Sequence, residues 1–237
     1  TFEIEYLFLR IRAKAVAEVS EFKITCPDDG KTQVDVSLDL EEIEVTVPRT
    51  HKKILDVGCG GGILAEALGK LGANVTGIDA SENTIGVAKS HSESIKSNVK
   101  FIQNTIEEFT AEKPDERFDV ITCLEMLEHV PSPNEIIKSC SQILKEDGDI
   151  FFSTINRNPR SYLFAVIGAE YILNLLPKGT HDYEKFIKPS ELAQWIRGAG
   201  LYSKETVGLS YNPITGNYWL GKDIQVNYMV HARKEED

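Results

Sequence analysis

Short apolar segments alternate with longer segments of helical spacing from residue 53 onward, and this alternation restricts the chain to few folds. The expected strands are KILDVG, NVTGID, VKFIQN, FDVITCLEM and DIFFSTIN. The expected helices between them are GILAEALGKLG, SENTIGVAKSHSESI and SPNEIIKSCSQILKEDG. Strands joined by helices of this length need right-handed crossovers, so neighbouring strands run parallel. The pattern predicts an α/β fold with a doubly wound, mostly parallel sheet.

The two ends of the chain follow other patterns. Residues 1–48 have helical spacing and then period-two alternation around PDDGK, which predicts a small appendage of a helix and a β-hairpin. We expect the main domain at 49–237, with a long insert at about 157–188. Segments 201–213 and 224–234 then indicate two further strands that close one sheet edge.

Charge and cysteine content exclude several classes of protein. The net charge of −11 argues against nucleic-acid binding, which needs a basic face. The four cysteines lack CxxC spacing, so neither a zinc site nor a disulfide framework is expected, and a reducing compartment is favoured. The sequence has no cleavable signal pattern, and no apolar run approaches the roughly 18 residues of a membrane span.

A glycine cluster follows the first strand of the main domain, at Gly58, Gly60, Gly61 and Gly62. This turn lies where the strands of such sheets end, and ligands bind there. A phosphate-binding P-loop is excluded because no Gly-Lys-Ser/Thr follows, and the G-x-G-x-x-G dinucleotide spacing fails because residue 63 is Ile. A tight turn without a ligand is the plain structural alternative.

Two aspartates distinguish the remaining ligands. Asp79 ends the second strand, where a carboxylate can accept hydrogen bonds from a ribose diol. Asp56 precedes the glycine loop, and an acidic group there attracts an ammonium and a sulfonium but repels a pyrophosphate. The pair favours S-adenosylmethionine (SAM) over a dinucleotide.

An E-x-x-E-H cluster stands just past a strand end, at Glu125, Glu128 and His129. If this segment turns helically, its side chains share a face and can converge on one cation, for which oxygen-rich ligands favour Mg²⁺. Alternatively, His129 acts as a metal-free general base that Glu128 orients. A third interpretation is that all three are polar loop residues before the next helix.

ILDVGCGGG, VTGID, FDVITCLEMLEHV and ILKEDGDIFFSTINR resemble class I SAM-dependent methyltransferases. CLEMLEHVPSP, TINRNPRSYLFAVIGAEYIL, PKGTHDYEKFIKPSEL and YNPITGNYWLGKDIQVNYM resemble, more narrowly, the O-methyltransferases of ubiquinone biosynthesis. The resemblance implies a Rossmann-like fold, methyl transfer to polyprenyl catechols or demethylubiquinol, and a divalent ion at the E-x-x-E-H cluster.

The resemblance also implies site residues. Gly58 would contact the cofactor through its backbone, Asp79 would bind the ribose, and Thr105 and Ile106 would lie near the adenine. Leu124 would lie beside the cofactor. The complete predicted cofactor site is Asp56, Gly58, Gly60, Asp79, Ala80, Thr105, Ile106 and Leu124. The predicted catalytic residues are His129, Glu128 and His181. The predicted metal ligands are Glu125, Glu128 and His129.

The insert carries an amphipathic stretch, residues 162–176, with basic residues on both sides. It is expected to contact a membrane surface, where a polyprenyl substrate dissolves, or to form a lid over the site. Residues 179–181, Tyr183 and Lys185 would line the acceptor pocket. The expected location is the cytoplasmic face of a bacterial inner membrane or, alternatively, the matrix side of the mitochondrial inner membrane. Association with other enzymes of ubiquinone biosynthesis is a further expectation.

Residues 1–48 depart from the family. They contain no Trp and no Asn-Pro-x-Arg element, whose arginine contacts the cofactor in the family, and they loosely resemble the small baseplate-hub assembly proteins of T4-like phages. Two alternatives to the leading function therefore stand: methylation of another small phenol, and an assembly module whose SAM fold is inactive.

Overall fold

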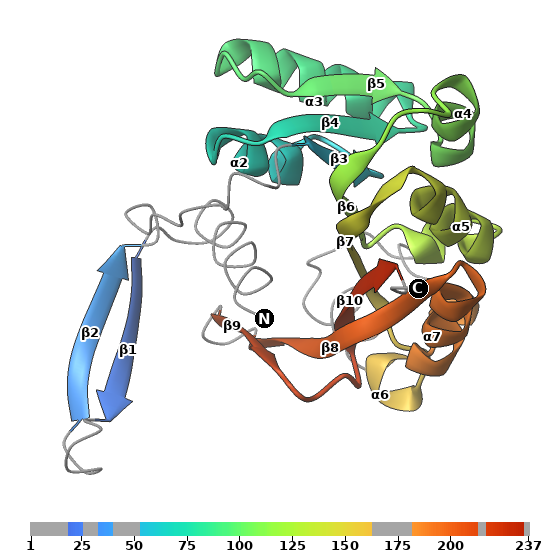
Figure 1. The fold of residues 1–237 in the computed structure, drawn as a ribbon. Coiled ribbons are helices and arrows are strands. Elements are labelled where there is room, and N and C mark those ends of the chain that lie inside the picture. The colour runs from blue at the N-terminus through green and yellow to red at the C-terminus, as the bar shows by residue number, and fades with distance from the viewer. Residues whose placement is uncertain (1–18, 26–32, 40–52, 163–181, 213–216, 235–237) are drawn as a thin grey trace. The chain divides into compact units, whose positions relative to one another are not determined.

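The computed structural model describes residues 19–25, 33–39, 53–162, 182–212 and 217–234 (Figure 1). The chain divides into two units, Thr1–Pro48 and Arg49–Asp237. In the first unit, β1 (Val19–Thr25) and β2 (Gln33–Asp39) form an antiparallel pair. The helix predicted before this hairpin lies outside the described residues.

The second unit is built around one sheet, whose described strands follow the order β5-β4-β3-β6-β7-β10-β8-β9. The strands are β3 (Lys53–Val57), β4 (Asn74–Asp79), β5 (Lys100–Gln103), β6 (Phe118–Leu124), β7 (Leu144–Ile155), β8 (Leu201–Asn212), β9 (Asn217–Gly221) and β10 (Asn227–Lys234). Strands β5, β4, β3, β6 and β7 are parallel, whereas β10 is antiparallel to both of its neighbours and β9 is antiparallel to β8. The predicted doubly wound, mostly parallel sheet is confirmed.

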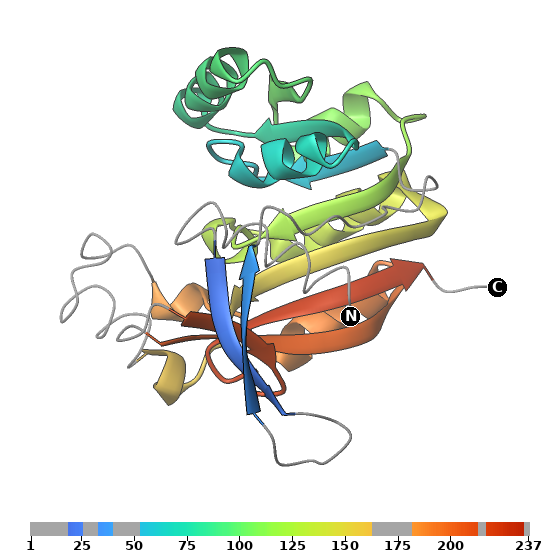
Figure 2. The same ribbon diagram turned by 90° about the vertical axis from the view of Figure 1, so that its left-hand side faces the viewer.

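Helices cover both faces of this sheet (Figures 1 and 2). They are α2 (Ile63–Lys70), α3 (Glu82–Ser94), α4 (Ile106–Glu112), α5 (Pro133–Ile143), α6 (Pro159–Ser161) and α7 (Pro189–Gly198), with 3-10 turns η1 (Leu127–His129) and η3 (Tyr183–Lys185). Neighbouring residues of β3 belong to different hydrophobic clusters: Leu55 packs in the cluster of α4, α5 and α7, and Ile54 in that of α2 and α3. This division follows from the alternation of side chains along a strand.

Local capping fixes two helices that border the site. Ser81, the first residue of the expected helix SENTIGVAKSHSESI, caps α3 by accepting a hydrogen bond from the backbone N–H of Thr84. Helix α4 was not among the helices expected above. It begins with a capping box in which Thr105 and Glu108 satisfy each other's backbone N–H groups. The T-x-x-E spacing at 105–108 is the sequence signal for this helix.

Helix α5 begins near Pro133 as expected but ends earlier than its sequence indicates. The expected helix ends just before Gly148, whereas α5 ends at Ile143 and β7 starts at Leu144. Leu144 already pairs with Phe118 of β6. A Cβ on Gly148 would lie 2.7 Å from the Leu144 side chain, so the glycine lets the chain fold back closely there.

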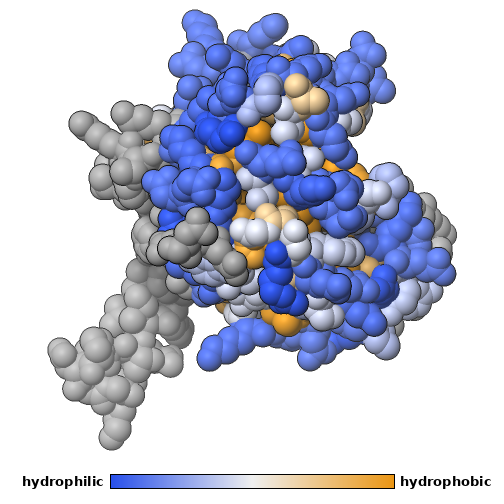
Figure 3. All heavy atoms as spheres, turned by 45° about the vertical axis from the view of Figure 1, so that its right-hand side comes forward, coloured by the Kyte–Doolittle hydropathy of each residue, from blue (hydrophilic) through white to orange (hydrophobic). Residues whose placement is uncertain are grey.

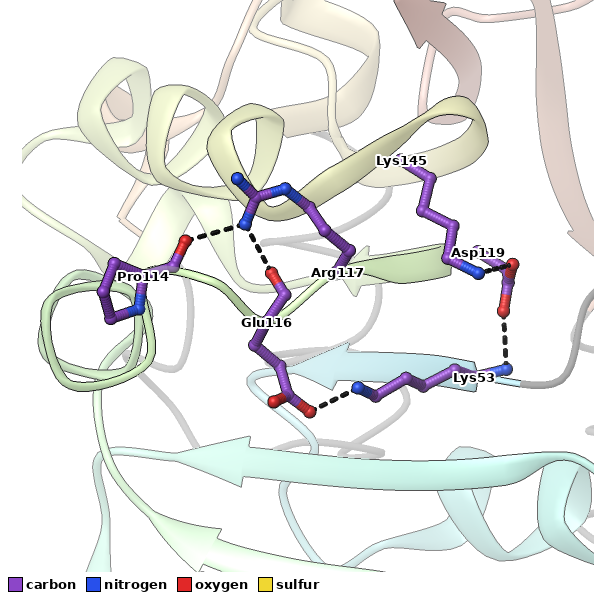
Figure 4. A network of polar contacts seen from close by, with 6 residues as sticks. All are labelled: Lys53, Pro114, Glu116, Arg117, Asp119 and Lys145. Carbon is purple, nitrogen blue, oxygen red and sulfur yellow. Dashed lines mark hydrogen bonds and ion pairs between the residues drawn. The ribbon is translucent and has the colours of Figure 1, made fainter.

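A polar network ties the amino ends of β3 and β6 together (Figure 4). Asp119 accepts a hydrogen bond from the Lys53 backbone N–H, 2.9 Å long, and pairs with the Lys145 ammonium. The Lys53 ammonium pairs with Glu116 and lowers the pKa of that carboxyl. The network lies at the amino ends of these strands, whereas ligands in this fold bind at the carboxyl ends, so the network contributes to stability.

The insert predicted at 157–188 is described at both of its ends. Arg160 pairs with Asp223. The rings of Tyr162 and Tyr183 meet edge to face with centroids 5.3 Å apart, so the two ends of the insert lie together. His181 and most of the predicted amphipathic stretch lie outside the described residues.

The surface in Figure 3 is largely hydrophilic, with small apolar areas between the polar side chains. The large apolar side chains that are exposed among the described residues are Ile63, Val87, Ile95, Tyr162 and Trp219. In the part of the chain that the structure describes, no helix is both long enough and apolar enough to cross a bilayer.

Candidate active site

The glycine loop between β3 and α2 bends through left-handed backbone conformations. Gly58, Gly60 and Gly62 have φ angles of 71°, 52° and 85°. Side chains also approach the loop closely: a Cβ on Gly58 would lie 2.6 Å from Cγ of Met126, and one on Gly62 would lie 2.5 Å from Cζ of Phe101. The loop therefore needs glycine both for its bend and for close contact.

Asp79, at the tip of β4, is tied to this loop. Its Oδ2 accepts a hydrogen bond from the Gly60 N–H at 2.9 Å. Its Oδ1 accepts from the Ser81 N–H at 2.8 Å and from the Thr84 hydroxyl at 3.0 Å. A carboxylate has about four acceptor positions, so this one is held in place and keeps acceptor capacity for a ligand hydroxyl.

A cavity of about 840 Å³ opens at the carboxyl ends of β3, β4 and β6. Strands β4 and β6 flank β3, so the cavity lies at the point where the strand order reverses, the usual ligand site of doubly wound sheets. The cavity is lined by Val57, Gly58, Ile78, Asp79, Ala80, Ser81, Asn104, Thr105, Ile106, Glu107, Glu125, Met126, His129, Val130, Pro131, Ser132, Glu135 and Ile136.

Asp56 lies behind the cavity wall rather than in it. Its side chain is buried, and Oδ1 accepts a hydrogen bond from the Thr122 hydroxyl at 2.7 Å. Oδ2 is buried without a hydrogen-bond partner among the described residues. Removal from water and, to a smaller extent, the charge of Asp79 raise the pKa of Asp56 to about 7, against the effect of the Thr122 hydrogen bond. The residue is a buried acceptor next to the lining residues Val57 and Gly58.

Glu125 directly follows β6 and lines the cavity, and its backbone has a left-handed conformation with φ of 50°. Ser153 donates a hydrogen bond of 2.7 Å to its Oε1, and Asn227 donates one of 3.3 Å to its Oε2. Partial loss of hydration and the nearby charge of Glu128 raise the pKa of Glu125 above its usual range, although these two hydrogen bonds act in the opposite direction.

The predicted metal ligands are not brought together. Glu128 is buried and accepts a hydrogen bond of 2.8 Å from the Thr154 hydroxyl, whereas Glu125 and His129 line the cavity. The left-handed Glu125 interrupts the helical turn that would align these side chains, and η1 starts only at Leu127. Within the described residues, no group of three His, Cys, Asp or Glu side chains is placed to hold a metal ion. The three-ligand site expected from the sequence is therefore not assembled.

Comparison with known proteins identifies the family. A family model described as a methyltransferase domain matches residues 35–205. A protein named ubiquinone biosynthesis O-methyltransferase from Saccharophagus degradans is 62% identical over 185 residues, which cover 78% of each chain. A protein of the same name from Acinetobacter baylyi is 57% identical over 185 residues, covering 78% of this chain and 77% of that one. This chain belongs to the ubiquinone biosynthesis O-methyltransferase family.

Solved methyltransferases share the fold at low sequence identity. A magnesium protoporphyrin IX methyltransferase from Synechocystis, solved with bound S-adenosylhomocysteine (SAH), aligns with a TM-score of 0.57 and 18% identity over 77% of this chain and 74% of that one. A SAM-dependent methyltransferase from Clostridium acetobutylicum aligns with a TM-score of 0.58 and 15% identity over 78% of this chain and 85% of that one. Both confirm the methyltransferase fold.

The structure gathers most, but not all, of the predicted site residues of this methyltransferase. Those that line the cavity are Gly58, Asp79, Ala80, Thr105, Ile106, Glu125 and His129. Gly60 and Asp56 do not line the cavity themselves. The Gly60 N–H donates a hydrogen bond to the lining residue Asp79, and Asp56 is buried behind the cavity wall. Glu128 does not line the cavity, and neither do Tyr183 and Lys185.

Leu124, which the resemblance places beside the cofactor, is the last residue of β6 and does not line the described cavity, whereas Met126 does. Its contact with the cofactor stays a prediction. The left-handed Glu125 turns the chain after the strand ends, so Met126 rather than Leu124 packs against Gly58.

Sequence reasoning also missed lining residues near the starts of three helices, α3, α4 and α5. These are Ser81, Asn104, Glu107, Val130, Pro131, Ser132, Glu135 and Ile136. Several lie at or next to the first turns of α4 and α5. The capping box at 105–108 and the S-P pair at 132–133 mark these helix starts in the sequence.

Proposed function

We propose that this enzyme transfers the methyl group of SAM to a phenolic hydroxyl of a polyprenylated catechol or demethylubiquinol in ubiquinone biosynthesis. The observation that carries the proposal is the cavity in which Asp79 and Glu125 face the same space from opposite sides, over the glycine loop. The relatives that share 55–62% identity carry the corresponding name.

The acidic groups of this cavity fit SAM. Asp79 keeps acceptor capacity for a ribose hydroxyl after its three protein hydrogen bonds. Oδ2 of Asp56, which has no hydrogen-bond partner among the described residues, suits a nearby ammonium group of the methionine portion, because a cation would stabilise the ionised form of Asp56. Gly58 leaves the space beside Met126 that any larger residue would fill.

Apolar side chains complete the cofactor site. Val57, Ile78, Ile106 and Met126 contribute to the cavity wall and would exclude water from the adenosyl group. Thr105 uses its hydroxyl to cap α4, so we assign it a backbone and packing contribution rather than a hydrogen bond to the adenine.

SAM supplies an electrophilic methyl group on a positively charged sulfur. The phenolic oxygen attacks that methyl in line, the carbon–sulfur bond breaks towards sulfur, and the products are the aryl methyl ether and SAH. A phenol with a pKa near 10 is a weak nucleophile at neutral pH, so a base must take its proton. We assign this step to His129, which lines the cavity. Glu128 is bound to Thr154, so its predicted role in orienting His129 is not part of the proposal.

Magnesium remains a prediction from the family resemblance. The described side chains do not assemble the three expected ligands, because Glu128 is turned into the protein. No step above requires the ion, and a rate measurement with and without Mg²⁺ decides whether it contributes.

Location and partners are also part of the proposal. A polyprenyl acceptor dissolves in a bilayer, so the enzyme must reach a membrane surface. We propose peripheral contact with the cytoplasmic face of a bacterial inner membrane, or with the matrix face of the mitochondrial one, and access to the other enzymes of the pathway there. Flotation of the protein with anionic vesicles, compared with neutral ones, tests this contact.

Isothermal titration of SAM and SAH into the purified chain tests the cofactor assignment. We expect micromolar binding that Asp79→Ala weakens at least tenfold, and methylation of a catechol that carries a short isoprenoid chain. Binding of SAM with turnover of only unsubstituted small phenols would shift the assignment to another phenol. A folded protein that binds neither compound would favour the assembly module.

A further inference from the structure

Two side chains outside the predicted site hold Glu125 at the cavity. Ser153 of β7 accepts a hydrogen bond from the Glu125 backbone N–H at 3.0 Å and donates one to Oε1 of the same residue at 2.7 Å. Asn227, the first residue of β10, donates to Oε2 at 3.3 Å. Asn227 reaches the site from 102 positions away in the sequence.

The backbone of Glu125 has an energetically unfavourable conformation, which the surrounding contacts must stabilise. Left-handed conformations of residues other than glycine cost on the order of 1–3 kcal/mol and are concentrated at functional sites. Among the described residues, Lys96 is the other non-glycine residue with positive φ, and it follows Ile95, the C-cap of α3, at the position where such a conformation is common. Glu125 follows a strand, so helix termination does not explain its conformation.

The orientation of Glu125 leaves it able to accept further hydrogen bonds. Ser153 and Asn227 occupy two of about four acceptor positions on the carboxylate. Glu125 keeps solvent-accessible surface and lines the cavity, so the remaining positions can face a ligand.

The position of Glu125 in the sheet indicates which ligand group it meets. Asp79 and Thr105 mark the adenosine end of the cavity at β4 and α4. Glu125 follows β6 and is held by β7 and β10, on the opposite side of the glycine loop. This is the side from which an acceptor must approach the methyl group.

We propose that Glu125 accepts a hydrogen bond from the second hydroxyl of an ortho-dihydroxy acceptor, and that Asn227 and Ser153 are positioning residues that fix Glu125 for this contact. The inference rests on the proposed function and deepens it. His129 takes the proton of the hydroxyl that is methylated, and Glu125 recognises the neighbouring hydroxyl, which keeps its proton. The site is thereby selective for catechols over phenols with a single hydroxyl.

Steady-state kinetics with two acceptors test this assignment. The acceptors are a catechol with a short isoprenoid chain and its counterpart with one hydroxyl. For Asn227→Ala we expect the KM for the catechol to rise about tenfold, since loss of orientation weakens the hydrogen bond between the acceptor hydroxyl and the Glu125 carboxyl. The KM for the monophenol and the Kd for SAM should stay within twofold of wild type. Asn74→Ala, an exposed residue at the start of β4, is the matched control.

A double-variant comparison shows whether Asn227 acts through Glu125. We expect Glu125→Gln to raise the KM for the catechol, and the combined variant to lose no more than Glu125→Gln alone. Equal effects on both acceptors, multiplying effects of the two substitutions, or a wild-type KM in Asn227→Ala would overturn the inference. If Asn227→Ala does not fold, Ser153→Ala carries the same comparison. Wild-type protein that binds SAM but methylates neither acceptor would instead refute the proposed function.

Discussion

Asp79 accepts a hydrogen bond from the backbone N–H of Gly60, 2.9 Å long, and this bond joins the tip of β4 to the glycine loop. The same carboxylate holds Ser81 and Thr84 at the start of α3. One side chain therefore fixes three backbone segments around the cavity and still presents an acceptor to it. Asp79, which the sequence predicts to bind the cofactor, therefore also holds the glycine loop in place.

We expect Asp79→Asn to lower both SAM affinity and stability. An asparagine cannot accept at both positions, so the amide group would face the Gly60 N–H or the donors of α3. The free energy of unfolding should fall by about 0.5–1.5 kcal/mol, the net contribution of a typical hydrogen bond, because these donors are only partly buried or exposed. Urea unfolding and SAM titration measure the two effects. Thr84→Val removes one of the bonds and should change SAM affinity only a few-fold; unchanged affinity in Asp79→Asn would contradict this role.

Alanine substitutions in the glycine loop should differ in a defined order. Gly61→Ala is expected to be tolerated, since its Cβ would lie 3.8 Å from Val87, in ordinary contact. Gly60→Ala has space but needs a left-handed residue, which costs about 1–2 kcal/mol. Gly58→Ala adds a clash with Met126 and should lose the most SAM affinity.

Melting temperatures and SAM affinities of the three variants test this order. Combining Gly58→Ala with Met126→Ala removes the contact with Cγ but leaves Cβ of residue 126 at 3.0 Å and the backbone strain in place, so recovery should be partial. Equal effects at Gly58 and Gly61 would mean that the described loop conformation is wrong.

Asp56 should make the stability of the ligand-free protein depend on pH. Its pKa is about 7 in the folded protein and 3.8 without the fold, so the folded state holds an extra proton between these values. Stability should therefore fall as pH rises from about 4 to 7 and level off above the folded pKa. Asp56→Asn should remove this contribution in urea unfolding curves, whereas Asp115→Asn, an exposed loop variant, should keep it.

SAM binding should reverse the protonation of Asp56. If the ammonium of SAM lies near the carboxyl, binding favours the ionised form and releases a proton near pH 6 to 7. Titration calorimetry in buffers of different ionisation enthalpy measures this release. Equal proton release by wild type and Asp56→Asn would refute the contact.

The sequence predicts the adenosyl end of this site better than the acceptor end. Gly58, Asp79 and Thr105 belong to one continuous strand–loop–helix pattern, whose geometry depends on local spacing. The acceptor end depends on a left-handed residue and on partners distant in sequence. No periodicity marks Glu125 as left-handed or pairs it with Asn227. The contact between Met126 and Gly58 was not predicted for the same reason, because the left-handed backbone of Glu125 decides which side chain faces Gly58.

The hydrogen bond from the Thr154 hydroxyl to Glu128 makes it possible to test a structural role of Glu128 apart from a metal-binding role. Thr154→Val should lower the free energy of unfolding by about 1–3 kcal/mol, because the buried carboxylate loses its donor. Glu128→Gln keeps an oxygen for the Thr154 hydroxyl and should keep stability and catechol turnover within a few-fold of wild type. Because Glu128 points away from the cavity, the ratio of rates in Mg²⁺ and in EDTA should be the same for wild type and Glu128→Gln. A ratio that falls to one only in the variant would show that Glu128 binds the ion, and that the carboxylate turns towards the cavity when the ion is present.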